Sequence, residues 1–515
     1  MAKGRSSDLS DRQLSGNRNK SALHSCMRAW AGFALLALPT MLLGMDLTLL
    51  HLLMPAIALD LQPSTTQALW ILDAYGFLIA GFLLTMGWLG DRVGRRRLLM
   101  FGLTGFALAS IAAAFAISAG MLIAARAALG IAGATLMPST LALISNLFQE
   151  QRQRALAIGM WATMWGIGYA LGPLVGGLLL EKFWWGAAFL IAVPVTLLVL
   201  LLAPFLLPEY RALNGGACLD VGSVVLSFFA MLPFVYGVKT ASESGFSMVA
   251  LVAMAFGLIA AWLFIRRQAR VQNPLIDLAM FRNRAFRAAL LILLLTLVAV
   301  GGTMFMVAQY LQLVKGHSPV AAGLWMSLAA VAMIAGGIGA PLLARIFRPG
   351  SVVAGSLALA AVGYVMLMRV GQADSGLLPV LTSLALAYLC NGTVAALGTD
   401  LVVGASPPEK AGSASALTEV VQDLGLSLGV ALLGSLASVA YATGVGSYAH
   451  LNLDGVRDSL GESLWAASSA TSDLSPEVLS QLQQAFMTGL QWVGTVNALC
   501  AAVLSVLAAL ALTRS

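Results

Sequence analysis

Long apolar segments recur along the whole chain and restrict its possible folds more than any other feature. Charged residues make up only 10% of the 515 residues, whereas a soluble domain carries about 25%. A membrane-spanning helix needs about 20 predominantly apolar residues. We find fourteen such segments: 29–58, 67–90, 98–116, 119–147, 155–180, 184–207, 220–239, 246–266, 285–312, 319–345, 351–370, 377–403, 412–440 and 485–512. The sequence therefore predicts an all-α integral membrane protein with fourteen transmembrane helices.

Lysines and arginines are distributed unevenly between the two sides of the predicted spans. With the N-terminus inside, 23 of the 29 lie on the cytoplasmic side and five on the other, while Arg126 lies within a span. The positive-inside rule then places both termini in the cytoplasm. This asymmetry accounts for the net charge of +7, so we expect no nucleic-acid partner. Residues 1–28 are polar and basic, and we expect a disordered cytoplasmic tail.

Neither the cysteine spacing nor any nucleotide-binding motif indicates a disulfide, a metal site or coupling to ATP. The four cysteines, Cys26, Cys218, Cys390 and Cys500, show no CxxC spacing, so we expect neither a disulfide framework nor a metal site. The sequence contains no G-x-x-x-x-G-K-[ST] motif for binding nucleotide phosphates. We therefore expect no cofactor, and coupling to an ion gradient, foremost of protons, rather than to ATP.

The stretch GIGYALGPLVGG, residues 166–177, carries small residues at four-residue spacing. Glycines at this spacing form a smooth helix face on which a second helix packs closely. A proline within the stretch removes a backbone donor and bends the helix. The residues of this predicted face are Gly168, Gly172, Pro173, Gly176 and Gly177. An ordinary packing face in a helix bundle is the alternative.

The loop after the second span reads GWLGDRVGRRR, residues 87–97. Its glycines allow a tight turn between two helices. Asp91 can face the positive N-terminal end of a helix in the other half of the protein. The arginines hold the loop on the cytoplasmic side and can pair with nearby carboxylates. We expect a cytoplasmic gating loop formed by Gly87, Gly90, Asp91, Arg92, Gly94, Arg95 and Arg96.

These stretches together resemble the major facilitator superfamily, in particular its drug:proton antiporters with fourteen spans. The loop is similar to the family signature G-x-L-a-D-r-x-G-r-r, and residues 166–177 are similar to its antiporter motif. Other stretches resemble further motifs of the family: MDLTLLHLLMP at 45–55, LWILDAYGF at 69–77, and LIAARAALGIAGA at 122–134, with Arg126 at the family's buried arginine. The resemblance covers about residues 30 to 512 and is closest to exporters of quaternary ammonium compounds and methyl viologen.

The resemblance implies the major facilitator fold, with two six-helix bundles and two additional helices between them. The N-terminal bundle would cover 29–207, the additional helices 220–266, a cytoplasmic loop 267–284 and the C-terminal bundle 285–512. Residues 441–484 would form an outer loop, either a helical hairpin whose second helix starts at Ser475–Pro476 or a disordered segment. The second-half counterpart of the signature loop, ARIFRPG at 344–350, lacks the aspartate.

The resemblance also implies a function, namely proton-coupled export of lipophilic organic cations across the cytoplasmic membrane. Quaternary ammonium compounds, dyes, biguanides and methyl viologen would be substrates, and we expect a monomer without enzymatic activity. The glycine–proline face would seal the interface between the bundles, so bulkier residues at Gly172 or Pro173 would reduce export and leave folding intact. The alternatives are export of a fatty acid, amino acid or siderophore, an uptake symporter, and a non-transporting membrane sensor or scaffold.

Five charged residues stand out within the predicted spans, because an ionised group near the bilayer centre costs at least about 2.5–3.5 kcal/mol. They are Asp46, Asp73, Arg126, Glu419 and Asp423. Glu419 and Asp423 are four residues apart and share a helix face, so their mutual repulsion favours protonation of one of them. We expect the four carboxylates to couple protons and bind the cation. The alternatives are a purely structural Asp46–Arg126 ion pair, an Asp73 bonded to backbone, and a water-facing pair on the thirteenth span.

Aromatic side chains can complete a cation site, because a desolvated cation–π contact is worth about 2 kcal/mol. Trp161 and Trp165 recur along one face of the fifth span, and Tyr310 lies in the ninth. With Tyr75 of the second span, these are the predicted cavity aromatics. An aromatic packing stripe or a lipid-facing belt is the alternative.

Overall fold

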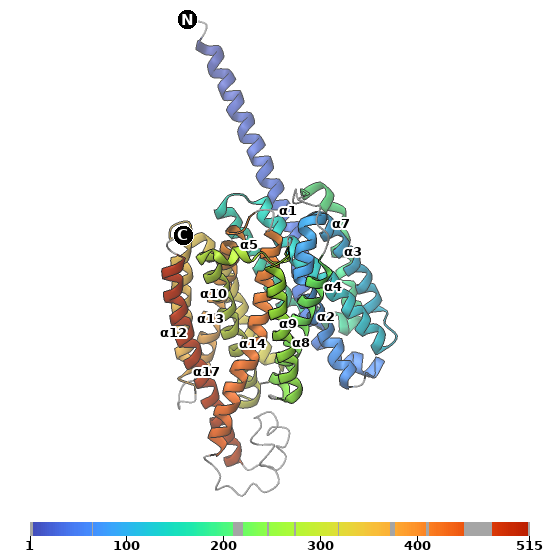
Figure 1. The fold of residues 1–515 in the computed structure, drawn as a ribbon, viewed down its shortest axis with the longest axis vertical. Helices are drawn as coiled ribbons and strands as arrows, with labels where there is room; N and C mark the ends of the chain where they lie inside the picture. Colours follow the sequence, from blue (N-terminus) through green and yellow to red (C-terminus); the bar gives the residue numbers. More distant parts are fainter. Residues whose placement is uncertain are drawn as a thin grey trace.

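The computed structural model describes residues 4–63, 65–209, 220–244, 247–271, 274–317, 319–370, 376–407, 411–446 and 476–512. Within these ranges all regular structure is helical (Figure 1). Thirteen helices in the described part are long and apolar enough to cross a membrane. A further helix, α5, runs over 32 residues, although several of its side chains lie outside the description. The prediction of an all-helical membrane protein is therefore confirmed.

The first half of the chain forms seven helices around one buried apolar cluster. The bounds are α1 Gly4–Leu61, α2 Thr65–Val93, α3 Arg95–Ala114, α4 Ala119–Leu147, α5 Gln151–Lys182, α6 Ala187–Leu190 and α7 Ala192–Leu206. The predicted sixth span is divided between α6 and α7, which meet at Ile191. Ser118 starts α4 as an N-cap, because its hydroxyl accepts a hydrogen bond from the Met121 amide at 3.2 Å.

The second half forms its own buried cluster. Its elements are η1 Leu278–Arg282, α10 Arg284–Gln309, the π-turn η2 Tyr310–Val314, α11 Pro319–Leu343, α12 Pro349–Leu367, α13 Leu378–Gly404, α14 Ala411–Gly446 and α17 Pro476–Ala511. Asn283 caps α10, and prolines stand at the first turns of α12 and α17, where a missing amide hydrogen costs nothing. Both chain termini lie at the same end of the molecule (Figure 1); we call it the termini end.

Two helices, α8 Val221–Ser244 and α9 Met248–Gln268, form a hairpin that packs against both α2 and α14 through α8. A polar network holds its termini end together. Asp220 accepts hydrogen bonds from Arg267 at 2.7 and 2.9 Å and from Ser223 at 2.6 Å, and these bonds hold the pKa of Asp220 below its usual range. The buried Gln268 donates to Ser223 and accepts from the Leu275 amide. The network therefore attaches the start of the following loop to the hairpin.

Two expected irregular segments are shorter than the sequence suggests. The predicted disordered tail is instead the first part of α1, which begins at Gly4 and extends well beyond the other helices (Figure 1). No proline interrupts this segment, and extending an existing helix avoids the cost of nucleating a new one. At the predicted outer loop, α14 runs on to Gly446 and α17 begins at Pro476. The intervening hairpin prediction lies outside the described residues.

The glycine face of α5 packs on α1. A Cβ added at Gly168 would lie 1.9 Å from the carbonyl oxygen of Met41, and one at Gly172 would lie 2.1 Å from the Thr48 hydroxyl. Backbone-to-backbone approach of this kind is what small residues allow in membrane helices. Because α1 belongs to the same half of the chain, these glycines do not seal an interface between bundles, which corrects the expectation from the sequence.

We therefore predict that Gly168→Leu lowers the stability of the protein itself. The added side chain meets backbone, which cannot rotate away, and overpacking of this kind costs about 1–3 kcal/mol or more. Thermal unfolding of purified protein in detergent measures the effect. Gly339→Leu is the matched control, since no described atom lies within 4 Å of a Cβ at that position of α11. Equal unfolding temperatures for the two variants would contradict the packing argument.

Candidate functional site

The loop at 87–97 joins the two halves of the chain at the termini end. Asp91, near the end of α2, accepts hydrogen bonds from the amide and hydroxyl of Ser413 at 3.3 and 3.4 Å. Ser413 stands in the first turn of α14, where unpaired amides make the helix end positive. Asp91 thus faces the N-terminal end of a helix in the other half, as its position in the sequence suggests.

Arg95 makes the interior of this loop rigid. Its side chain is fully buried, forms an ion pair with Asp91 and donates to the Gly87 carbonyl oxygen at 2.7 Å. A Cβ at Gly90 would lie 2.5 Å from the Arg95 guanidinium, so only glycine leaves room for it. Gly94 has φ of +112°, a conformation that other residues rarely adopt. Both glycines are therefore required by the local geometry.

Arg96 and Arg97 of the loop lie against the end of α7, in the same half of the chain. Arg96 donates to the carbonyl oxygen of Leu207 at 3.0 Å and lies 3.5 Å from the Glu209 carboxylate. Arg97 lies 3.8 Å from the same carboxylate, and Arg92 stacks 3.9 Å over the ring of Trp88. Reasoning from the sequence did not identify Glu209; it is the first carboxylate after α7, and that position was the available signal.

A second contact joins the two halves, an ion pair that was not predicted from the sequence. Arg154 in the first turn of α5 donates to Asp400 of α13 at 2.6 Å, and the aspartate side chain is 5% exposed. Nearby, a Cβ at Gly159 would lie 2.1 Å from the Gly337 carbonyl oxygen, so α5 and α11 touch through their backbones. Two features of the sequence could have indicated this pair. Asp400 lies near the end of a predicted span, and the second-half counterpart of the signature loop, at 344–350, lacks an aspartate.

Deeper in the first half, Asp46 of α1 forms a buried ion pair with Arg126 of α4. Arg126 also donates to the Ile71 carbonyl oxygen at 3.2 Å, and its guanidinium lies 4.6 Å from the ring centre of Tyr75. The ring is fully buried, and its hydroxyl has no hydrogen-bond partner among the described residues. The structure therefore adds Tyr75 to the Asp46–Arg126 pair that the sequence suggested.

The carboxylates of α14 have a different environment. Glu419 is 5% exposed, and its Oε1 atom has no hydrogen-bond partner within the described part of the chain. Asp423, one turn further, is partly buried, and no described cation pairs with it. It lies close enough to Tyr75 to interact electrostatically, as do Asp46 and Arg126. Asp423 of one half thus lies near the Asp46–Arg126 pair of the other, with Glu419 one turn away on the same helix.

For several other predicted site residues the structure describes the helix position but few or no contacts. Asp73 lies on α2, but its side chain is outside the description, as are those of Pro173 and Gly177 on α5. Gly176 is buried on α5. Trp161 is buried in the cluster of the first half and donates to the Thr140 hydroxyl at 3.1 Å.

The predicted cavity aromatics do not come together as one group. Tyr310 is buried in the cluster of the second half, 5.8 Å from Lys315, whereas Trp161 belongs to the cluster of the first. Trp165 is partly buried on α5. Tyr75 stands next to the Asp46–Arg126 pair, because the Arg126 guanidinium lies over its ring. For Trp161 and Tyr310 the geometry favours the packing alternative.

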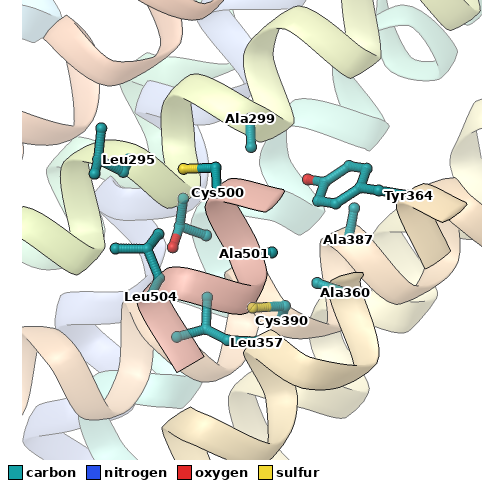
Figure 2. A pocket seen from close by; sticks show the side chains of 11 residues that line it. Leu295, Ala299, Leu357, Ala360, Tyr364, Ala387, Cys390, Cys500, Ala501 and Leu504 are labelled. Carbon is teal, nitrogen blue, oxygen red and sulfur yellow. The ribbon is translucent and has the colours of Figure 1, made fainter. Parts of the chain in front are cut away.

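A small cavity in the second half lies apart from these charges. Figure 2 shows Cys390, Cys500 and Tyr364 among apolar side chains of α10, α12, α13 and α17. Its volume of about 10 Å³ leaves room for roughly one water molecule. No cluster of three or more potential metal-ligating side chains occurs in the described ranges. We therefore centre the candidate site on the carboxylates of α1 and α14.

Comparison with known proteins places the chain among transporters of similar length. It is 41% identical over 455 residues to the multidrug efflux pump LfrA of Mycolicibacterium smegmatis, which covers 88% of this chain and 90% of LfrA. It is 34% identical over 472 residues to the methyl viologen resistance protein SmvA of Salmonella typhimurium, covering 89% of this chain and 93% of SmvA.

Solved structures show the same fold. The human organic anion transporter MFSD10 matches with a TM-score of 0.59 at 16% identity, over 92% of this chain and 99% of that one. The E. coli fucose:proton symporter FucP matches with a TM-score of 0.56 at 15% identity, over 93% and 98%. The Major Facilitator Superfamily model matches residues 36–430. The chain therefore belongs to the major facilitator superfamily, as a multi-pass membrane transporter rather than an enzyme.

Proposed function

We propose that the protein exports lipophilic organic cations in exchange for protons across the cytoplasmic membrane. The observation that carries this proposal is the pair on α14, the buried Glu419 and the partly buried Asp423, without a described cation to compensate them. A buried carboxylate is stable when it is protonated or paired with a cation. The same two groups can therefore hold either protons or a cationic drug, which is the requirement for exchange.

The relatives support the direction and the substrate class. LfrA is described as a multidrug efflux pump and SmvA as a methyl viologen resistance protein, and methyl viologen is an organic dication. Asp46 is neutralised by Arg126, so it does not add free negative charge for a drug. Protonation of Asp46 would release Arg126, which gives this pair a role in coupling rather than in binding. Asp73 remains a candidate for a further binding carboxylate.

The exchange requires that drug and proton bind with opposed preference. Protonation of Glu419 and Asp423 from the outer side removes the charge that holds the cation, so the drug leaves. Loss of the protons to the cytoplasm restores the charge, so a new cation binds. We infer that Asp91–Ser413 and Arg154–Asp400 close the cytoplasmic side during release, because both contacts join the two halves at the termini end.

Proton release from energised inside-out vesicles tests the carboxylate pair. Ethidium, a benzalkonium compound and methyl viologen are added in turn to vesicles with wild type or Glu419→Gln/Asp423→Asn. We expect each cation to dissipate the pH gradient with wild type and the rate to fall about tenfold or more with the double variant, a rise of about 1.4 kcal/mol or more in activation free energy.

Glu181→Gln is the matched control, since this carboxylate is exposed at the end of α5. It should behave like wild type. Dissipation by the double variant at the wild-type rate would exclude the pair as proton carriers. No dissipation by wild type with any of the three cations would exclude the proposed substrate class.

The Arg154–Asp400 pair predicts a second result. Removing one partner of a buried pair costs about 3–5 kcal/mol, so Arg154→Asp should destabilise the closed cytoplasmic side and reduce export. The double reversal Arg154→Asp/Asp400→Arg should recover a substantial part of the export rate. Arg152→Asp, an exposed change two residues away on α5, should have little effect.

Labelling of Ala396→Cys separates gating from misfolding. Ala396 is fully buried, and its Cβ would lie 3.1 Å from a Cβ at Gly159, so it reports on the contact between the halves. A membrane-impermeant maleimide added to inside-out vesicles should label this cysteine faster when Arg154→Asp is also present. Equal labelling rates with and without Arg154→Asp would show that the ion pair does not hold this side closed.

A further inference from the structure

A groove on the surface of the second half lies where the membrane boundary is expected. It has a volume of about 580 Å³ and is lined by Arg284, Val503, Val506, Leu507, Leu510 and Ala511. Arg284 is the first residue of α10 and Ala511 the last of α17, so both stand at the termini end of their candidate spans. The groove therefore starts at one face of the predicted bilayer and runs into it.

The wall of the groove is apolar and faces outward. Val503, Val506 and Leu510 are 66%, 60% and 62% exposed, although they lie within a membrane span. From Val503 to Ala511 the helix rises by about 12 Å. One leaflet of hydrocarbon is about 15 Å thick. The groove thus matches an acyl chain of a single leaflet in both polarity and length.

The rim of the groove is cationic. Arg284 is exposed and has no carboxylate partner among the described residues, and Arg282 and Arg287 are exposed beside it. The chain has no Asp or Glu from Leu278 to Ala373, and none after Glu477. The segment that follows Arg284 therefore carries no carboxylate through the ends of α10, α11 and α12. A ligand with an anionic head and an apolar tail satisfies both parts of the groove.

We propose that this groove binds an anionic phospholipid of the cytoplasmic leaflet. Arg284 contacts the phosphate group, and an acyl chain lies along Val503, Val506 and Leu510. Each basic residue near a membrane surface contributes about 1 kcal/mol toward anionic lipid, which corresponds to about a fivefold preference over a zwitterionic lipid. The bound lipid connects the first turn of α10 with the last turns of α17.

Native mass spectrometry of the purified full-length protein tests the site with defined probes. The protein is prepared in neutral detergent and mixed with phosphatidylglycerol or phosphatidylcholine of equal chain length. Wild type should retain phosphatidylglycerol about fivefold more strongly than phosphatidylcholine. Arg284→Ala should abolish the preference, and Val506→Trp, which fills the groove without removing charge, should reduce retention of both lipids.

Arg345→Ala is the matched control, because Arg345 is an exposed arginine at the same end but outside the groove lining. It should keep the wild-type preference, and thermal unfolding should show all variants folded. The proposal is overturned if Arg284→Ala keeps the preference or if Arg345→Ala loses as much of it. It is also overturned if myristate displaces phosphatidylglycerol at equal concentration, since a single-chain acid would then be the ligand.

Discussion

An ionised side chain inside a hydrocarbon layer needs a partner, and this requirement organises the charged residues of the protein. Asp46 meets it through Arg126, and two further buried pairs at the termini end, Asp91 with Arg95 and Asp400 with Arg154, follow the same rule. Glu419 and Asp423 have no such partner among the described residues. The unpaired groups carry the proposed chemistry because their state has to change with each transport cycle, whereas a permanent partner would hold one state.

Close backbone contacts provide the surfaces on which the halves meet. Gly159 of α5 and Gly337 of α11 touch without intervening side chains, and within the second half Gly392 of α13 approaches the backbone of Met333 in α11 in a similar way. Such contacts keep helices about as close as backbones allow. Few side chains interdigitate at such a contact. A pair of helices can therefore shift there without withdrawing side chains from one another. The glycines of α5 nearer its other end, at Gly168 and Gly172, instead hold α1.

Much of this architecture follows from the sequence, because membrane helices and their charges leave clear patterns. The helical fold and the family were predicted and are confirmed. The position of Asp91 against a helix of the other half also followed from the loop signature. What the sequence did not show were contacts between distant segments, such as Arg154 with Asp400, since nothing in the spacing of two residues 246 positions apart indicates that they meet.

The assignment of the glycine face to the interface between the halves failed for a related reason. Spacing identifies a smooth helix face but not the helix that covers it, and at Gly168 that helix is α1. The tail was assigned as disordered from its polarity, whereas its helix continues from a neighbouring span. The sequence also did not show which aromatic side chains come together. Trp161 and Tyr310 belong to different apolar clusters.

Helix α14 is continuous from Ala411 to Gly446 and carries both Ser413 and Glu419. They are six positions apart, which is about 9 Å along one rigid element. Rotation of this helix as a whole moves the docking point of Asp91 and the buried carboxylates by the same angle. Undocking of the loop and reorientation of the buried carboxylates are therefore coupled directly by the helix backbone. No chain of intermediate side-chain contacts is needed between them.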